Sequence, residues 1–304
     1  MTRQNSVDNK AHNNTGAAMK NAFTIDVEDY FQVEAFARVI DRRSWNDFET
    51  RVIANTDRLL AMLESSGVRA TFFVLGWVAR KHPEIVRAIA AAGHEVASHG
   101  MSHRLVYTQS PQEFRQETLA AKALLEDQCQ QPVIGYRAAT YSITRKSLWA
   151  LDILCEAGFQ YDSSIFPMRH DRYGIPDANP LPHVLTTPDG GKLVEFPISV
   201  LRYARATIPV AGGGYFRLFP YGFTRWALRE INRGGQEFVF YIHPWEVDPE
   251  QPRVHGASVL SRFRHYQNLG SCQKRLDRLL ADFTFDTMHS VLVSRRLLPS
   301  PGAA

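Results

Sequence analysis

Segments typical of strands and of helices alternate along most of this chain, and that alternation limits the fold more than any other feature. Short apolar and β-branched runs are followed, at least four times between residues 21 and 162, by longer segments with apolar residues at helical spacing. Such alternation is typical of a parallel sheet or barrel of βα units. Strands are predicted over residues 23–25, 70–75, 94–98, 133–137, 159–162, 193–198 and 237–242. Helices are predicted over residues 45–63, 83–92, 111–129, 146–157, 221–233 and 259–283.

Residues 163–220 interrupt the alternation. They are rich in proline and glycine, and we predict long loops there around the strand at 193–198. We expect one domain over residues 19–290, with an insertion near 163–220. Residues 1–18 are polar with no apolar centre, which predicts a disordered leader, and residues 291–304 are expected to form a C-terminal tail.

The composition excludes several classes of function. Apolar residues make up 44% of the chain and charged residues 22%, as in globular enzymes. The net charge of +4 is small and no basic run stands out, so nucleic acid is not an expected partner. The sequence contains no stretch of 18 apolar residues, so no transmembrane segment is predicted. The three cysteines, at positions 129, 155 and 272, lack disulfide or zinc-site spacing and favour reduced thiols in a cytoplasmic protein.

Polar side chains follow the predicted strands at the points where those strands end. His99 and His103 come directly after the strand at 94–98, and imidazoles about one turn apart can bind a single zinc ion. Asp26 and Glu28 follow the first strand, and His243 follows the strand at 237–242. In a βα barrel the chemistry lies at these carboxyl ends of the strands. The pattern therefore predicts a hydrolytic metal site.

Seven phrases, in order, resemble the NodB-homology polysaccharide deacetylases of carbohydrate esterase family four. They are TIDVEDYFQ, ATFFVLGWVA, GHEVASHGMSH, GYRAATYSI, YDSSIFP, AGGGYFR and FYIHPWEVDP. The resemblance covers roughly residues 20–285 and is strongest for a subgroup with a DVED first motif that accompanies exosortase-linked exopolysaccharide gene clusters. It implies an α/β fold, a distorted (β/α) barrel of about seven strands.

The resemblance also implies the ligands of a divalent metal, most simply zinc. His99 and His103 match the two imidazole ligands of the family, and Glu28 matches its carboxylate ligand, with Asp29 as the alternative. Asp26 matches the catalytic base. A dication held by three protein ligands lowers the pKa of a bound water toward ~7.

Two further catalytic residues are implied in the same way. Arg137 is expected to hold the Asp26 carboxylate through a charge-assisted hydrogen bond. His243 matches the general acid that protonates the leaving amine. Asp162 is expected either to orient His243 or to cap the turn at Ser163 and Ser164. The loop that begins at Arg137 departs from the family pattern, because it reads Arg-Ala-Ala-Thr where many relatives have Arg-x-Pro-Tyr: Ala139 replaces the proline and Thr140 stands in place of the tyrosine.

The predicted function is metal-dependent removal of N-acetyl groups from N-acetylhexosamine units of a polysaccharide or oligosaccharide. Two alternatives stay open: an allantoinase-like amidohydrolase acting on a small cyclic amide, and a carbohydrate-binding relative with no activity. Because no signal peptide is apparent, we expect the protein in the cytoplasm or at the inner face of the membrane.

Overall fold

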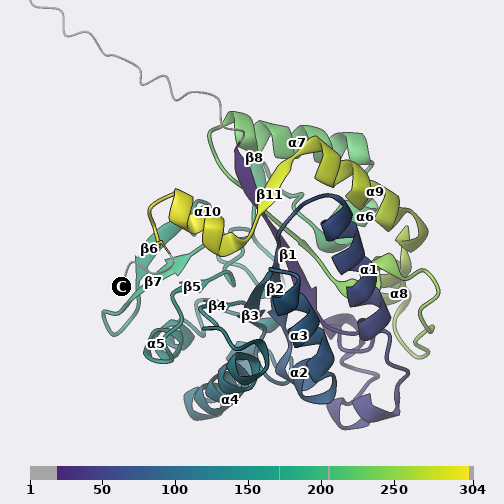
Figure 1. The fold of residues 1–304 in the computed structure, drawn as a ribbon, viewed down its shortest axis with the longest axis horizontal. Helices are drawn as coiled ribbons and strands as arrows, with labels where there is room; N and C mark the ends of the chain where they lie inside the picture. The colour runs from purple at the N-terminus through teal and green to yellow at the C-terminus, as the bar shows by residue number, and fades with distance from the viewer. Residues whose placement is uncertain (1–18, 171, 205, 301–304) are drawn as a thin grey trace, which may run out of the picture.

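The computed structural model describes residues 19–170, 172–204 and 206–300, so the predicted leader at 1–18 and the last four residues of the predicted tail lie outside it (Figure 1). Its strands are β1 Lys20–Val27, β2 Thr71–Val74, β3 Glu95–Ser98, β4 Gly135–Tyr136, β5 Tyr161–Asp162, β6 His183–Thr186, β7 Lys192–Glu195, β8 Val200–Tyr203, β9 Ala206–Pro209, β10 Val239–Ile242 and β11 Thr284–Asp286. Its α-helices are α1 Val52–Ser65, α2 Gly76–Lys81, α3 Pro83–Ala91, α4 Pro111–Cys129, α5 Trp149–Glu156, α6 Gly213–Leu218, α7 Tyr221–Arg233, α8 Val259–Tyr266, α9 Leu269–Asp282 and α10 Met288–Ser294.

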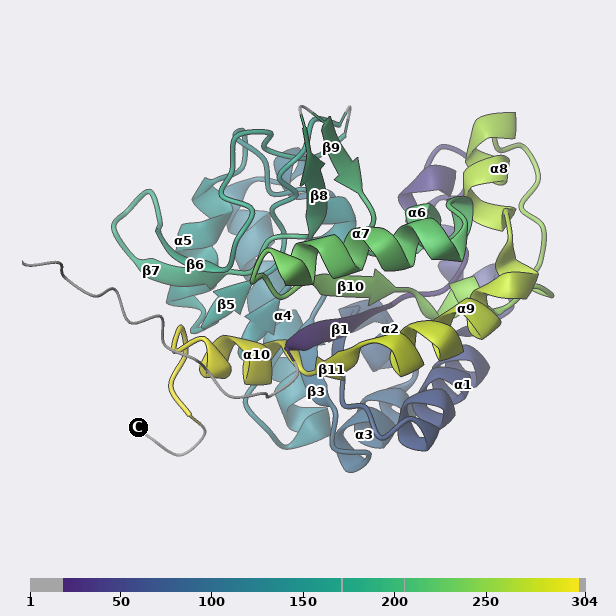
Figure 2. The ribbon, with the colours of Figure 1, turned by 90° about the horizontal axis from the view of Figure 1, so that it is seen from above.

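One curved sheet forms the centre of the fold. Seven strands pair in parallel in the order β10-β1-β2-β3-β4-β5-β7, β6 pairs antiparallel with β7, and β11 pairs with the first part of β1. Helices surround the outer face of this sheet (Figures 1 and 2). The predicted α/β fold is confirmed. The barrel is distorted and open, since within the described residues no ladder joins β6 to β10.

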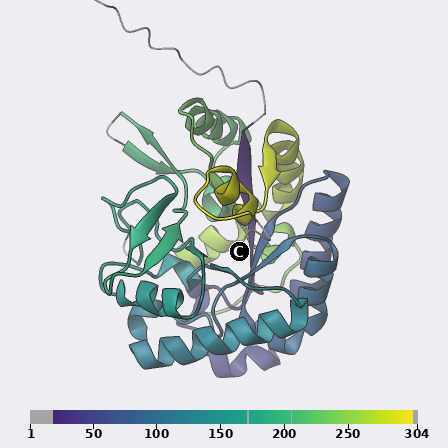
Figure 3. The same cartoon turned by 60° about the vertical axis from the view of Figure 1, so that its left-hand side comes forward.

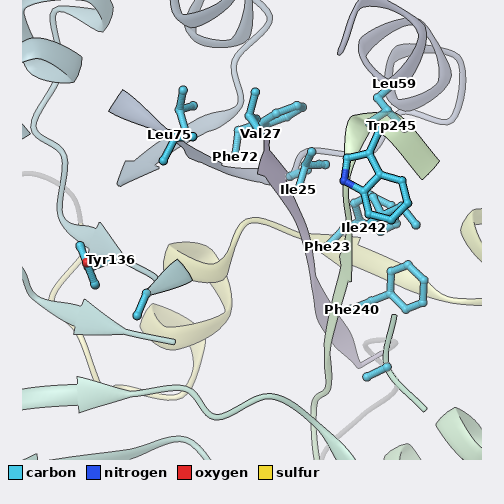
Figure 4. Packing of buried hydrophobic residues seen from close by; sticks show 14 of the residues in the cluster. Phe23, Ile25, Val27, Leu59, Phe72, Leu75, Tyr136, Phe240, Ile242 and Trp245 are labelled. Atoms are coloured by element: carbon cyan, nitrogen blue, oxygen red, sulfur yellow. The ribbon is translucent and has the colours of Figure 1, made fainter. Parts of the chain in front are cut away.

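Side chains of β1 alternate between the two sides of the sheet, as they do in any strand. Phe23 and Ile25 pack outward against the helical layer, as Figure 4 shows, whereas Ala22 joins the cluster inside the barrel. Thr24 and Asp26 share the inner side with Ala22. Both faces of β1 are buried, as expected for a central parallel strand. Its alternation therefore directs the Asp26 carboxylate into the barrel.

Helix α10 covers the end of the barrel where the strands begin. Met288, Val291 and Leu292 are fully buried in the interior cluster, and the Met288 N–H donates to the Thr71 hydroxyl at the start of β2 (2.8 Å). In Figure 3 this yellow helix lies in the middle of the ring of outer helices. The predicted division between domain and tail at residue 290 therefore falls inside a packed helix.

Three predicted segments differ from the structure. The helix predicted over 45–63 is a short 3₁₀ helix, η2 Arg42–Asp47, followed by α1. The helix predicted over 259–283 is two helices, α8 and α9, because Asn268 adopts a left-handed conformation (φ 54°). The stretch 163–220 lies mainly outside helices and strands, as predicted, but it holds two hairpins, β6–β7 and β8–β9, and the short helix α6, where a single strand at 193–198 was predicted.

Among the described residues, no helix combines the length and the apolar character that crossing a bilayer requires.

Leu292 tests the role of α10 as part of the core. We expect Leu292→Ala to lower the free energy of unfolding by about 2–4 kcal/mol, because it leaves a cavity among fully buried side chains. Leu119→Ala is the matched control, since Leu119 on α4 is 46% exposed. Urea denaturation followed by circular dichroism measures both. Equal effects of the two variants would refute the placement of α10.

Candidate active site

The carboxyl ends of β1, β3, β4 and β10 bring the predicted residues together. β1 lies between β10 and β2, with Ile25 opposite Ile242 and Asp26 opposite Phe73, and β3 lies beside β2. The polar residues that follow these strands therefore meet at one edge of the sheet. All are buried except His243, whose side chain is 17% exposed and marks the side open to solvent.

Glu28, His99 and His103 form a buried group of three possible metal ligands. Their ligand atoms lie within 4.8 Å of one another. His99 Nδ1 lies 2.9 Å from the Arg137 carbonyl oxygen, a contact that places the proton on Nδ1 and leaves Nε2 as the free donor atom. Glu28 Oε2 lies 2.7 Å from His103 Nε2, yet it accepts no directed hydrogen bond. A zinc ion is coordinated by buried imidazole nitrogen and carboxylate oxygen atoms that lie close together. The three side chains therefore fit this metal.

The electrostatics hold Glu28 and His99 in the protonation states that bind a cation. Burial raises the pKa of Glu28, but the nearby imidazoles of His103, His243 and His99 outweigh it and lower that pKa to about 2. Burial lowers the pKa of His99 to about 4. At neutral pH the carboxylate is therefore ionised and the His99 ring is neutral, as metal binding requires.

Asp29, the alternative ligand, is occupied elsewhere. Its Oδ2 accepts the backbone N–H groups of Arg51 (2.8 Å) and Val52 (3.0 Å) at the start of α1, and its Oδ1 accepts that of Tyr30 (2.9 Å). A carboxylate in this position satisfies amides that the first turn of a helix leaves unpaired. Glu28, not Asp29, faces the two histidines.

Asp26 and Arg137 form a fully buried ion pair. Arg137 Nη1 donates to Asp26 Oδ1 at 2.6 Å and to Thr24 Oγ1 at 2.9 Å. Its remaining donors reach the Ser163 carbonyl and hydroxyl oxygens, and its guanidinium lies 4.0 Å from the centre of the Phe73 ring. One oxygen of Asp26 is thus fixed by the arginine, while Oδ2 faces the site.

The loop that departs from the family pattern is tied down by hydrogen bonds. Thr140 and Tyr141 have positive φ (54° and 52°), and the Tyr141 hydroxyl lies 3.5 Å from Asp26 Oδ2. The Ser142 hydroxyl donates to the Ala139 carbonyl (2.6 Å) and accepts the Val106 N–H (3.0 Å). The conformation that a proline would favour is therefore held by other contacts, and this loop supplies an aromatic hydroxyl to the site.

His243 is held by a partner that the sequence reasoning did not identify. Its Nδ1 lies 2.7 Å from Glu246 Oε1, whose carboxylate also accepts from Arg217 Nε (2.6 Å). Burial lowers the pKa of His243, but the Glu246 hydrogen bond and the charges of Glu28, Glu246 and Asp26 outweigh it and raise that pKa to about 9. The other ring nitrogen, Nε2, lies 3.4 Å from Glu28 Oε1 and 3.9 Å from Asp26 Oδ2. His243 is therefore a cation at neutral pH, with Nε2–H directed into the site.

Asp162 caps the turn instead of orienting His243. Its carboxylate accepts the Ser164 hydroxyl (2.5 Å) and backbone N–H (3.3 Å). Glu246 lies three residues after His243 in the phrase HPWE, where Pro244 begins a short 3₁₀ helix. This spacing from His243 is the signal in the sequence that could have identified Glu246. Arg217 gave no such signal, because only the folded chain brings it to Glu246.

Comparison with known proteins relates this geometry to a family. Residues 44–161 match the family described as polysaccharide deacetylase, and residues 163–293 match one described as a domain of unknown function, DUF3473. The chain is 35% identical over 99 residues to a chitooligosaccharide deacetylase of Bradyrhizobium sp. (strain ANU 289). That match covers 33% of this chain and 43% of the relative, so the chain spans less than half of that relative's length.

Two solved structures share the fold of this chain. A putative polysaccharide deacetylase from Mycobacterium smegmatis superposes with a TM-score of 0.58 over 95% of this chain and 98% of its own, at 21% identity. The Puue allantoinase gives the same TM-score over 90% of this chain and 88% of its own, at 14% identity. The fold therefore does not decide between the two reactions.

The two neighbouring carboxylates give a matched test of the metal site. We expect Glu28→Ala to weaken zinc binding roughly tenfold or more, because it removes one of three ligands. Asp29→Ala should leave zinc binding unchanged and lower the free energy of unfolding by about 1–2 kcal/mol, through loss of the helix cap. Zinc content by elemental analysis and urea denaturation measure the two effects. Loss of zinc from Asp29→Ala alone would reverse the assignment.

Proposed function

We propose that this chain hydrolyses N-acetyl groups from hexosamine units of a polysaccharide, with zinc held by Glu28, His99 and His103. The observation that carries the proposal is the position of His243 Nε2. It lies within 4 Å of both Asp26 and Glu28, so a proton donor, a carboxylate base and the three ligands surround one point. Amide hydrolysis needs all three functions at once.

A bound dication would supply Lewis-acid polarisation of the acetamide oxygen and a lower pKa for a nearby water. The protein supplies the proton transfers. Asp26 Oδ2 takes a proton from the attacking water, while Arg137 keeps the carboxylate oriented through Oδ1. The C–N bond of the tetrahedral intermediate then breaks as His243 donates its Nε2 proton to the nitrogen, which leaves as an amine, and acetate is released.

Glu246 and Arg217 position the proton donor. Glu246 accepts from both the backbone N–H of His243 (3.1 Å) and its Nδ1, which fixes the ring plane and the tautomer. Arg217 in turn holds Glu246 ionised: burial raises the pKa of that carboxyl, but the arginine and His243 lower it below its ordinary value. These residues do not touch the reacting atoms, so we assign them a positioning role.

The polymer we propose is an exopolysaccharide, on the resemblance of the DVED motif to the subgroup found with exosortase-linked gene clusters. The chitooligosaccharide deacetylase match favours a sugar acetamide over the cyclic amide of an allantoinase. Mass spectrometry of acetate loss from a panel of N-acetylhexosamine oligomers, with and without added metal, tests both points. Turnover of a small cyclic amide in place of every sugar would select the allantoinase-like alternative. Saccharide binding without acetate release at any metal loading would select the carbohydrate-binding alternative.

Asp26 and His243 should be separable from metal binding. We expect Asp26→Asn and His243→Ala each to lower kcat at least a hundredfold, since each removes one proton transfer. Zinc content should stay at the wild-type value in both. Acetate release from an acetylated oligosaccharide, with zinc determined on the same samples, gives the comparison. Full turnover in either variant would remove that residue from the mechanism.

The pH dependence of kcat should report the His243 proton. The acid form exists below its pKa, so kcat should fall as pH rises through that value. We expect the fall between 6.5, the ordinary value, and about 9, because a bound dication offsets the part contributed by Glu28. Glu246→Gln removes one stabilising charge and should shift the fall to lower pH. An unshifted profile in Glu246→Gln would contradict the positioning role.

A further inference from the structure

Helix α8 is attached directly to the residues that hold His243. Its one buried residue is His265, whose ring stacks on Trp245 at 4.1 Å, and Trp245 stacks on His243 at 5.2 Å. Arg217 donates to the carbonyl oxygens of Arg264 and His265 at the end of the helix (3.1 and 2.8 Å). The helix is thus fixed beside the site through His265 and through the carbonyl oxygens at its end.

The outer face of α8 is apolar and exposed. Val259, Leu260 and Phe263 are 83%, 55% and 56% exposed. At about 100° per residue these three side chains share one arc of about 100°, and His265 points the opposite way. Val39, 42% exposed, lies near this helix, within 3.6 Å of where a side chain on Gly256 would begin. We call Val39, Val259, Leu260 and Phe263 the α8 patch.

Arginines flank the α8 patch. Arg262 and Arg264 lie on either side of the apolar arc, and Arg38 belongs to the neighbouring segment that follows η1 Glu34–Phe36, against which α8 packs (Figure 2). All three are exposed, and among the residues the structure describes none of them has a carboxylate ion-pair partner. Glu34 is the acidic residue that lines the groove beside the patch.

We propose that the α8 patch docks this protein on an anionic membrane surface. Exposed Val, Leu and Phe side chains on one helix face enter the boundary between headgroups and acyl chains, and flanking arginines bind lipid phosphates. A second copy of the chain is the less favoured occupant. A twofold contact through this patch would bring Arg262 and Arg264 against the same arginines of the other copy.

This docking, which rests on the proposed function for its purpose, sets the substrate class of the site. The α8 patch lies on the face of α8 opposite His265, and the His265 ring is connected to His243 through the stacked ring of Trp245. A protein bound through the patch would keep its site near the bilayer surface. The substrate would then be a glycan held at that surface, such as a lipid-linked oligosaccharide, in preference to free polymer.

Vesicle binding tests the proposal without any activity measurement. We expect the full chain to co-sediment with vesicles of phosphatidylglycerol and phosphatidylcholine, weakly or not at all with phosphatidylcholine alone, and less as salt is raised. Leu260→Ser with Phe263→Ser should reduce binding at least tenfold, and Arg262→Gln with Arg264→Gln roughly fivefold for each arginine. Leu119→Ser is the matched control, because Leu119 is similarly exposed but lies on α4.

The outcomes separate this proposal from the proposed function. Acetate release from a soluble oligosaccharide should be unchanged in all three variants, which alter exposed side chains only and keep the Arg264 carbonyl that accepts from Arg217. Vesicle binding without deacetylation would leave docking intact and overturn the proposed function. Equal vesicle binding by wild type and the α8 variants, or a dimer in analytical ultracentrifugation that those variants abolish, would overturn docking.

Discussion

The buried ion pair between Arg137 and Asp26 is the interaction on which the rest of the site depends. A charged guanidinium with no exposed surface is stable only if its donors are all used. Here they reach Asp26 and Thr24 on β1 and Ser163 after β5. Removing one partner of such a pair costs about 3–5 kcal/mol. The pair therefore fixes the base and, at the same time, the relative positions of the strands that carry it.

A second buried arginine, Arg217, holds the proposed acid, His243, in place through Glu246. Arg217 neutralises Glu246, Glu246 holds His243, and no member of the three is freely exposed. The two arginine–carboxylate pairs have opposite consequences. In the first, the Asp26 carboxylate keeps one oxygen free, as the proposed base requires. In the second, both the histidine and the arginine bind the Glu246 carboxylate, and the protonated His243 is the proposed acid. The two proposed roles thus depend on the atom that each arrangement directs into the site: Asp26 Oδ2 for the base and His243 Nε2 for the acid.

The sequence predicted what strand periodicity and strand ends determine, and missed what long-range contacts determine. The parallel strands and the convergence of Asp26, Glu28, His99, Arg137 and His243 follow from local pattern and from the geometry of βα units. Glu28 could not be separated from Asp29 by sequence, because that choice depends on the start of α1, more than twenty residues away. Arg217 and the packing of α10 depend on contacts between distant segments, which no local pattern records.

The site draws on both halves of the chain, and this division has a consequence for the region of unknown function. His99, His103 and Arg137 lie in the segment that matches the polysaccharide deacetylase family, whereas Arg217, His243 and Glu246 lie in the segment 163–293. Asp26 and Glu28 precede both segments. Together with the first segment they supply the proposed metal ligands and base, whereas the proposed proton donor, His243, lies in the second segment. Amide nitrogen does not leave without that proton. In the proposed mechanism the second segment therefore completes the chemistry, and through α8 the same segment presents an apolar face near the proposed proton donor.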